Sequence, residues 1–251
     1  CSSWREEQKE GALAQLAAER KEMGKVRYGQ EYLGLFLDDL QQFFADKLIL
    51  ACMDSVRPEL ISKKADNYLG VDIARMGEDE STFEIVKLIG EQIFQVENLV
   101  TTKTRLNQTT NQILALDNQY NFSKIYIDDE GIGVGVMDYL FDLDQTKRKT
   151  VSINNSTRIV DYKNEQTATI FKEVLYNNLL ALMERREIHL LKDDAIFQSL
   201  KSVQYEYTKD KYGKAQLKIF GNYTHIAEGL IRAAWCIKHK INKLWITALK
   251  V

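Results

Sequence analysis

The chain has 251 residues, of which 45% are hydrophobic and 28% are charged, and its formal net charge is -2. This composition suits one substantial core with an appended element, and it excludes a generic basic protein that coats nucleic acid, because such a protein needs a large excess of Lys and Arg. No window approaches about 18 uninterrupted apolar residues and no signal-peptide pattern opens the sequence, so we expect neither a membrane span nor a secretory leader.

The first part of the chain is predicted to be helical. Residues 4–23 carry an apolar stripe among Glu, Gln, Lys and Arg, and residues 30–53 form a second helical run. Pro58, the only proline, lies in the mixed segment 54–66, where a helix should stop and a connection begin. We therefore divide the chain into a helical segment, residues 1–60, and a main domain, residues 61–251.

The main domain is predicted to combine strands and helices. Residues 68–74, 82–89 and 92–100 read as three consecutive strands of an antiparallel meander. The later predicted elements are a helix at 104–120, a strand at 124–128, a helix at 131–140, a strand at 151–153, a helix at 165–186, a hairpin of 202–207 with 215–220, and a helix at 223–239. The predicted fold class is α/β, a mixed sheet flanked by helices.

The three cysteines, Cys1, Cys52 and Cys236, are far apart and include no C-x-x-C pair. Their spacing favours neither a thiolate zinc site nor a disulfide framework, and it indicates a reducing, cytoplasmic setting. Because the sequence begins with Cys1 rather than Met, we expect it to be a fragment or a processed product of a longer protein. From Lys201 onward ten basic residues outnumber three acidic ones, so the last fifth of the chain is markedly basic.

Two aspartates interrupt apolar strand patterns. Asp72 lies within Tyr68-Leu-Gly-Val-Asp-Ile-Ala74, and Asp128 ends the run Ile125-Tyr-Ile-Asp just before a glycine-rich turn. Burying an isolated carboxylate costs several kcal/mol unless a cation or hydrogen bonds compensate it. Either acid alone is more often a turn or helix-cap residue, but two of them at strand ends predict a shared ligand site.

His225 and Glu228 are three residues apart in the last predicted helix and therefore share one of its faces. A lone histidine near a helix end is by default a partly buried residue with a hydrogen-bonded ring, so its function depends on its neighbours. Together with Asp72 and Asp128 these residues form a hard, oxygen-rich set that suits Mg²⁺ or Mn²⁺ rather than structural zinc. With two such ions about 3.5 to 4 Å apart, one would activate the attacking water and the other would stabilise the leaving oxygen, so a phosphodiester bond could be hydrolysed by in-line displacement.

Two basic segments are candidates for phosphate contacts, and they contain Lys147, Arg148 and Lys149, and Lys209, Lys211 and Lys214. Solvated loops are an equally simple interpretation of both segments. The series Gly131-x-Gly-x-Gly135 lacks the G-x-G-x-x-G spacing and the ribose-binding acid of a nucleotide site, so we interpret it as a tight strand-to-helix turn.

The order of these segments resembles the nuclease domain of the terminase large subunit of tailed double-stranded DNA viruses. The resemblance rests on residues 68–79, 125–140 and 223–230, and residues 27–44 resemble the stretch that joins that family's packaging ATPase to its nuclease. The third segment departs from the family's frequent pattern, because His225 and Glu228 stand where two Asp residues are commoner. Related resolvases of the same fold also have His there. Asp129 is an alternative to Asp128, and Asp79 is a candidate peripheral ligand.

The resemblance implies a ribonuclease H-like, metal-dependent endonuclease that cuts concatemeric double-stranded viral DNA during genome packaging in the host cytoplasm. A small terminase subunit and the portal of the procapsid would guide it. The ATPase would belong to the same polypeptide, but this chain has no G-x-x-x-x-G-K-[ST] loop, so we do not expect it to hydrolyse ATP. The alternatives are a Holliday-junction-resolvase-like or transposase-like nuclease, and a catalytically degenerate domain of this fold that only binds DNA.

Overall fold

A computed structural model describes residues 42–73, 80–128, 133–160, 168–209 and 215–241. It divides the chain into two compact units, Cys1–Gln42 and Phe43–Val251, and the fold described below is that of the second unit. The helix predicted over residues 4–23 lies outside the described residues, as does most of the helix predicted over residues 30–53. In the described part of that second range, the helix α4 is limited to Asp46–Cys52.

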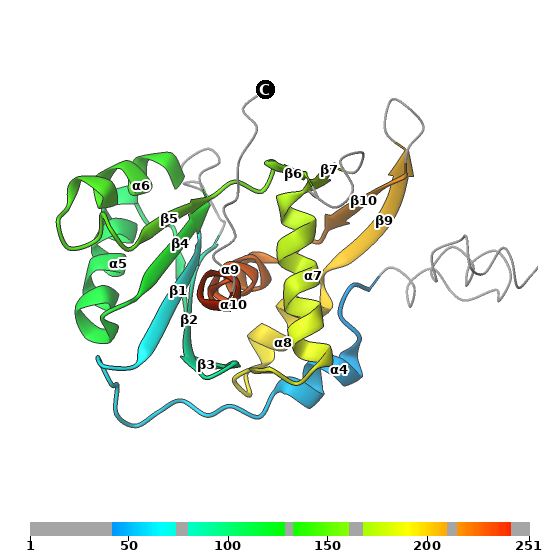
Figure 1. The fold of residues 1–251 in the computed structure, drawn as a ribbon, viewed down its shortest axis with the longest axis horizontal. Coiled ribbons are helices and arrows are strands. Elements are labelled where there is room, and N and C mark those ends of the chain that lie inside the picture. Colours follow the sequence, from blue (N-terminus) through cyan, green and yellow to red (C-terminus); the bar gives the residue numbers. More distant parts are fainter. Residues whose placement is uncertain (1–41, 74–79, 129–132, 161–167, 210–214, 242–251) are drawn as a thin grey trace, which may run out of the picture. The chain divides into compact units, whose positions relative to one another are not determined.

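The centre of the fold is a six-stranded mixed sheet (Figure 1). In spatial order its strands are β5 (Thr150–Ile153), β4 (Lys124–Asp128), β1 (Asp66–Asp72), β2 (Glu80–Ile89), β3 (Gln92–Thr102) and β8 (Ile188–His189). The β1, β2 and β3 strands form the predicted antiparallel meander. The β4 strand pairs in parallel with both β1 and β5, and β8 adds a parallel edge beside β3. The predicted mixed α/β sheet is therefore confirmed.

Helices cover both faces of this sheet. On one face lie α5 (Leu106–Tyr120) and α6 (Gly133–Asp142), and α9 (His225–Ala233) crosses the other face, where it contacts β1, β2 and β4 (Figure 1). The α7 helix (Phe171–Glu184) and the α8 helix (Asp194–Lys201) pack against α9. No helix among the described residues has the length and apolar character needed to cross a membrane.

The alternation of side chains along β1 and β4 decides which of them face α9. The core beneath α5 contains Leu69, Val71, Ile125 and Ile127. The core around α9 contains Tyr68 and Tyr126 instead. Because successive side chains of a strand point to opposite faces, Asp72 and Asp128 share the face of these tyrosines. Both acids are therefore on the α9 side of the sheet.

Part of the segment predicted as a separate helical region is built into this domain. Phe44, Ile49 and Cys52 are buried in the same core as α7, α8 and α9. The α4 helix contacts both α7 and α8. Residues 43–52 therefore fold with the main domain, whereas the assignment of the preceding residues to the end of an ATPase stays a prediction.

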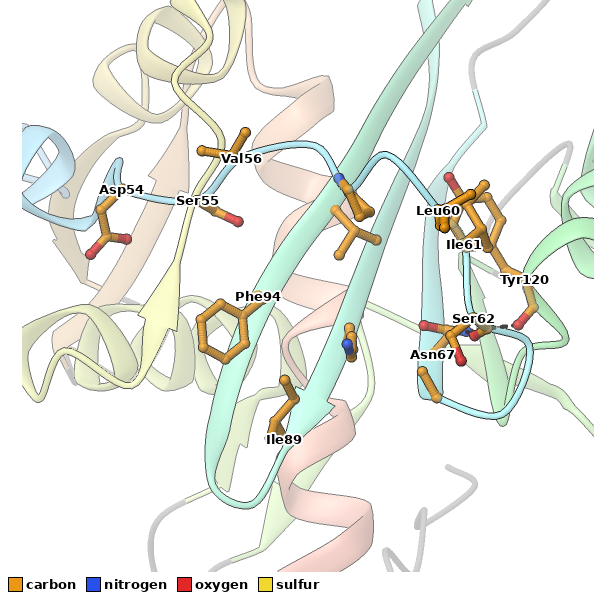
Figure 2. A pocket seen from close by; sticks show the side chains of 14 residues that line it. Asp54, Ser55, Val56, Leu60, Ile61, Ser62, Asn67, Ile89, Phe94 and Tyr120 are labelled. Atoms are coloured by element: carbon orange, nitrogen blue, oxygen red, sulfur yellow. Dashed lines mark hydrogen bonds between the residues drawn. The ribbon is translucent and has the colours of Figure 1, made fainter.

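The connection that follows α4 runs across β2 and β3 toward the start of β1 (Figure 2). It helps to line a hollow of about 340 Å³ together with Ile89 and Phe94 of the β2–β3 hairpin. Leu88 of β2 pairs with Asp66, the first residue of β1, so this hollow lies at the opposite end of β1 from Asp72. Neither Asp72 nor Asp128 lines it.

Two predicted helices have different bounds in the structure. The helix predicted at 165–186 begins only at Phe171, because Ala168–Ile170 forms β7, which pairs antiparallel with β6 (Arg158–Val160). Thr169 and Ile170 are β-branched and favour this extended conformation. The helix predicted at 223–239 is divided into α9 and α10 (Cys236–Ile241).

Two other elements were not predicted. The β8 strand has only two residues, which is too short to produce a period-two pattern. The α8 helix begins after Asp193, whose side chain accepts a hydrogen bond from the amide of Ala195 over 2.9 Å. This is the usual role of an N-cap aspartate. The predicted hairpin is confirmed as β9 (Gln204–Lys209) and β10 (Ala215–Phe220).

The α9 helix lies directly on the backbone of β1 because Gly70 has no side chain. A Cβ atom on Gly70 would lie 2.2 Å from the carbonyl oxygen of Gly229 and 2.5 Å from the amide nitrogen of Ala233. A Cβ atom on Gly229 would in turn lie 2.7 Å from Cγ of Glu84. These glycines set the separation between α9 and the sheet, and so they bring Glu228 within reach of the strand-end acids.

We predict that Gly70→Ala lowers the free energy of unfolding by about 3 kcal/mol, the upper end of ordinary overpacking costs, because backbone atoms must move. Gly135→Ala on the exposed face of α6 is the matched control, since its Cβ would meet Cδ1 of Leu106 at 3.6 Å, an ordinary contact. In the control variant the free energy of unfolding should be unchanged or higher by up to about 1 kcal/mol. Urea denaturation measures both, and equal effects would contradict the close packing of α9 on β1.

Candidate functional site

Two carboxylates meet at the carboxyl ends of neighbouring parallel strands. Val71 of β1 pairs with Ile127 of β4, and Asp72 and Asp128 are the next residues along each strand. Their side chains are 15% and 17% exposed, so the acids lie at a partly open rim of the core. This edge of a parallel sheet is where ligands commonly bind in α/β proteins.

Arg232 of α9 connects these two acids with a third one. Its side chain is fully buried, Nη1 donates to Oδ1 of Asp72 over 3.2 Å, and Nη2 donates to Oδ2 of Asp128 over 2.7 Å. Nη2 also lies 3.4 Å from Oε2 of Glu228, which precedes it by one helical turn. The planar fork of a guanidinium is suited to contacting several carboxylates at once. We call Asp72, Asp128, Glu228 and Arg232 the acidic cluster.

Glu228 is surrounded by hydrogen-bond donors. Its Oε1 accepts from the hydroxyl of Tyr176 over 2.8 Å and lies 2.9 Å from Nζ of Lys172, and both of these residues belong to α7. Its Oε2 lies 3.4 Å from Nδ2 of Asn155, which is also 3.4 Å from Oδ2 of Asp128. Both oxygens of this nearly buried carboxylate therefore have partners.

Electrostatics fixes the protonation of these groups. Burial alone would raise the pKa of Glu228, but the charges of Arg232 and Lys172 outweigh burial and lower the pKa below its usual range. Burial would lower the pKa of Arg232, whereas the neighbouring carboxylates raise it. The pKa of Tyr176 is raised, first by burial and then by the charge of Glu228. Glu228 is therefore ionised, and the neutral Tyr176 donates to it.

His225 begins α9 beside Asp72. Its Nδ1 lies 2.9 Å from Oδ2 of Asp72, and its side chain is 31% exposed. Its backbone carbonyl accepts a hydrogen bond from the hydroxyl of Thr82 over 2.9 Å, which ties the first turn of α9 to β2. Because a carboxylate only accepts, Nδ1 of His225 carries the proton, and in the neutral ring Nε2 has the lone pair.

The structure brings together the four residues singled out in the sequence, which are Asp72, Asp128, His225 and Glu228. The three acids gather around the guanidinium of Arg232, and His225 contacts one of them, Asp72. Among the residues that the structure describes, no group of three or more His, Cys, Asp and Glu side chains is arranged to hold a metal ion. Their role as ligands stays a prediction. Asp79 and Asp129 lie outside the described residues.

The first predicted basic segment lies away from the acidic cluster. Nζ of Lys149 lies 2.9 and 3.0 Å from the two carboxylate oxygens of the buried Asp117. Lys149 directly precedes Thr150, which pairs with Ile125 near the start of β4, so this segment is at the other end of the strand from Asp128. The structure does not bring Lys147, Arg148 or Lys149 to the acids.

The second predicted basic segment belongs to the β9–β10 hairpin. Lys209 is the last residue of β9, and Lys211 and Lys214 lie outside the described residues. This hairpin borders a groove of about 340 Å³, to which it contributes Thr208 and Lys218.

The groove opens beside the acidic cluster. It is lined by Asn155, Ser156, Ile170, Lys172, Glu173, Thr208, Leu217, Lys218 and Ile219. Asn155 and Lys172 belong both to the groove and to the surroundings of Glu228. Lys218 is 60% exposed and adds a second cation to the groove. Glu173 also lines the groove, and each lysine pairs with a glutamate, so the groove combines cationic and anionic groups beside the strand-end acids.

Sequence reasoning missed four residues of this site, which are Arg232, Lys172, Asn155 and Tyr176. Arg232 had the same signal that identified Asp72, because it is a charged residue among the apolar positions of its helix. It also lies four residues after Glu228, on the same helix face. The other three come from distant segments, and nothing in their local sequence marks them.

The mixed sheet and the helices on both of its faces define a ribonuclease H-like fold, as predicted. Solved structures with this fold include nuclease domains of phage large terminases. The large terminase nuclease of the thermophilic phage G20c, solved with bound magnesium, superposes with a TM-score of 0.57 at 17% identity, covering 77% of this chain and 96% of that chain. The large terminase nuclease domain of Thermus phage P74-26 gives a TM-score of 0.56 at 16% identity, covering 80% and 98%.

A longer large terminase, from another thermophilic bacteriophage, gives a TM-score of 0.55 at 12% identity. That match covers 88% of this chain and 51% of the other, so this chain corresponds to about half of that protein. At these identities the likeness shows the fold. No family model matches the sequence, and neither does any curated protein.

Glu84 is a further buried carboxyl group beneath α9. It accepts hydrogen bonds from Nε2 of Gln95 over 2.6 Å and from Nδ2 of Asn98. Burial raises the pKa of Glu84 to about 8, although these two hydrogen bonds act in the lowering direction. Glu84 is therefore mostly protonated at neutral pH, in contrast to Glu228.

We predict that Glu84 makes stability depend on pH. Its pKa of about 8 exceeds the ordinary value of 4.5, so its contribution to stability is complete below about pH 4.5 and is lost as the pH rises toward 8. The loss is at most about 1.4 kcal/mol per pH unit. Glu84→Gln removes this titration, so the free energy of unfolding of the variant relative to the parent should rise across this window. Denaturant unfolding at several pH values measures the difference, with the exposed Glu206→Gln as control, and a pH-independent difference would refute the prediction.

Proposed function

We propose that this chain is the nuclease domain of a phage large terminase and that it hydrolyses phosphodiester bonds of double-stranded DNA with a divalent metal ion. The observation that carries the proposal is the meeting of Asp72 and Asp128 at adjacent strand ends, opposite Glu228, in a fold shared with large terminase nucleases. One of those nucleases was solved with magnesium, cobalt and zinc, which supports a requirement for a divalent ion.

The donor chemistry fits one hard divalent ion. Magnesium is commonly bound by one or two carboxylates, while water and substrate phosphate complete its shell. Asp72 and Asp128 would hold the ion, with the imidazole of His225 beside them. Glu228 is less suited as a ligand because its two oxygens are contacted by four donors, whereas each oxygen of Asp72 has one donor in the described contacts. When bound, the ion would supply positive charge to the scissile phosphate and lower the pKa of a water molecule.

The side chains around the cluster would orient the substrate and hold protons at defined atoms. Asp72 fixes the Nδ1 proton of His225, so that Nε2 can accept a proton or bind an ion. Lys172 would present its charge where the groove meets the acidic cluster. A fixed cation at that position stabilises the negative charge that develops on a phosphate during hydrolysis.

The groove beside the cluster is the candidate path of the DNA backbone. Lys172 and Lys218 line it, and contacts of this kind position a duplex without reading its sequence. Lys209 belongs to the hairpin that borders the groove, whereas Lys149 is held by Asp117. We therefore favour the hairpin over the segment 147–149 as a phosphate-binding element. The small terminase subunit and the portal would guide the full-length protein.

A second candidate function is a domain of this fold that binds DNA but has lost catalysis. The observation that favours it is Arg232, which forms ion pairs with Asp72, Asp128 and Glu228 and so already compensates acids that metal ions would otherwise bind. Under this alternative, DNA binding would persist without cleavage at any metal concentration.

We predict that Asp72→Asn and Asp128→Asn each lower the rate of plasmid nicking in Mn²⁺ by more than about 100-fold. Removing a residue that only hydrogen-bonds to a metal ligand already lowers metal affinity or activity by about 10- to 100-fold, so removing the ligand itself should lower the activity further. Nicking is measured on agarose gels, and circular dichroism verifies the fold of each variant.

The matched control is Asp144→Asn, which removes a surface carboxylate that pairs only with a neighbouring lysine in the described contacts. It should nick DNA like the parent. Undiminished nicking by both cluster variants would sink the proposed function. DNA binding without nicking by the parent protein itself would instead establish the second candidate.

We also predict that Lys218→Met weakens binding to a short DNA duplex and reduces the slope of log affinity against log salt by about 0.9, the value for one lost phosphate contact. Lys147→Met is the matched control, because Lys147 is another partly exposed lysine with an acidic partner but lies outside the groove. Fluorescence anisotropy at several salt concentrations measures both slopes. Equal slopes for the two variants would show that the groove is not the DNA path.

A further inference from the structure

The acidic cluster already holds most of the positive charge that its acids require. Its three carboxylates, Asp72, Asp128 and Glu228, are contacted by Arg232, and Glu228 is also contacted by Lys172. Among the described residues, three negative charges and two positive charges leave one net negative charge at this position before any metal is added. A site for two divalent ions would have to accept four further positive charges at this position.

The position of the guanidinium also decides which oxygens a metal can use. Arg232 contacts Oδ1 of Asp72, Oδ2 of Asp128 and Oε2 of Glu228, one oxygen from each acid. The second oxygen of Asp72 is contacted by His225, and that of Glu228 by Tyr176 and Lys172. The guanidinium therefore already contacts one oxygen of every acid that a second divalent ion would need.

Arg232 is firmly held where it is. Its side chain has no exposed surface, and Nη1 donates to the backbone carbonyl of Glu228 over 2.8 Å in addition to its contact with Asp72. Its Nε is buried and has no hydrogen-bond partner among the residues that the structure describes. A buried polar atom of this kind costs free energy, so the gain from the three carboxylates must exceed that cost for this conformation to be preferred.

Building on the proposed function, we infer that Arg232 is the resident cation of this centre and takes the place of one of two divalent ions. Each chain then binds at most one Mn²⁺ or Mg²⁺ at the acidic cluster. The cluster also assembles in the absence of metal, because the guanidinium relieves the mutual repulsion of its acids.

The number of bound ions tests this inference on the unmodified chain. Isothermal titration with Mn²⁺, together with electron paramagnetic resonance of the bound ion, counts the ions per chain. One ion that is lost in Asp72→Asn is the expected result, and no bound ion would also agree with the inference. Two ions that are both lost in Asp72→Asn would overturn it.

A second measurement uses variants of the arginine. Arg232→Met removes the charge and keeps an unbranched chain, so its melting temperature should fall in EDTA and recover in excess Mn²⁺, while the parent changes little between the two conditions. Arg57→Met is the matched control, because Arg57 also bridges two acids, Glu97 and Asp193, outside the cluster. Its melting temperature should not depend on metal. If Arg232→Met does not fold in either condition, Arg232→Lys is the second variant, because it keeps the charge and should fold in EDTA. The inference would be overturned if Arg232→Lys did not fold in EDTA and was stabilised by two Mn²⁺ ions.

The failure of this inference is distinguishable from failure of the proposed function. If two ions bind at the cluster and DNA is cleaved, the nuclease assignment stands and the role of Arg232 as a replacement for a metal ion falls. A second outcome has three parts: at most one ion binds, the stability of Arg232→Met depends on metal, and the parent does not cleave DNA. In that case the role of Arg232 stands and the nuclease assignment falls.

Discussion

The buried guanidinium of Arg232 and the three carboxylates around it hold together the edge of the sheet where β1 and β4 end. Each of these groups would be costly in the core on its own, since removing one partner of a buried ion pair typically costs about 3 to 5 kcal/mol. Together they connect β1, β4 and α9, and Lys172 and Tyr176 extend the network to α7. The same contacts that stabilise the fold therefore keep Glu228 ionised and define the orientation of the three acids.

The packing of α9 on β1 and β4 brings the members of this network within contact distance. The alternation of side chains in β1 and β4 turns Asp72 and Asp128 to the α9 side, and the bare backbone of Gly70 lets α9 lie against the sheet. Thr82 then fixes the first turn of α9 through the carbonyl of His225. The acids consequently lie at a rim that adjoins the groove lined by Lys172 and Lys218, whereas the hollow beside Ile89 and Phe94 lies at the other end of β1. Fold and proposed function meet at this rim.

The part of the site that sequence could predict is the part with a local signal. A charge inside an apolar strand marked Asp72 and Asp128, and a three-residue spacing placed His225 and Glu228 on one helix face. Contacts between distant segments were not predictable in this way: Lys149, a predicted phosphate ligand, contacts Asp117, which lies 32 residues earlier. For the same reason we predicted from the sequence that metal ions compensate the negative charge of the acids. In the structure, Arg232, one turn after Glu228, compensates much of that charge. The strand at Ala168–Ile170 was missed because the apolar spacing of the helix that follows extends back into it.

A crystal structure of the domain with Mn²⁺ and a short DNA duplex, with the ion located by anomalous scattering, would test this arrangement most directly. We predict one manganese position in contact with Asp72, Asp128 and a backbone phosphate in the groove, while Arg232 still contacts Glu228. Manganese bound elsewhere, or DNA that avoids the rim between β1 and β4, would contradict it.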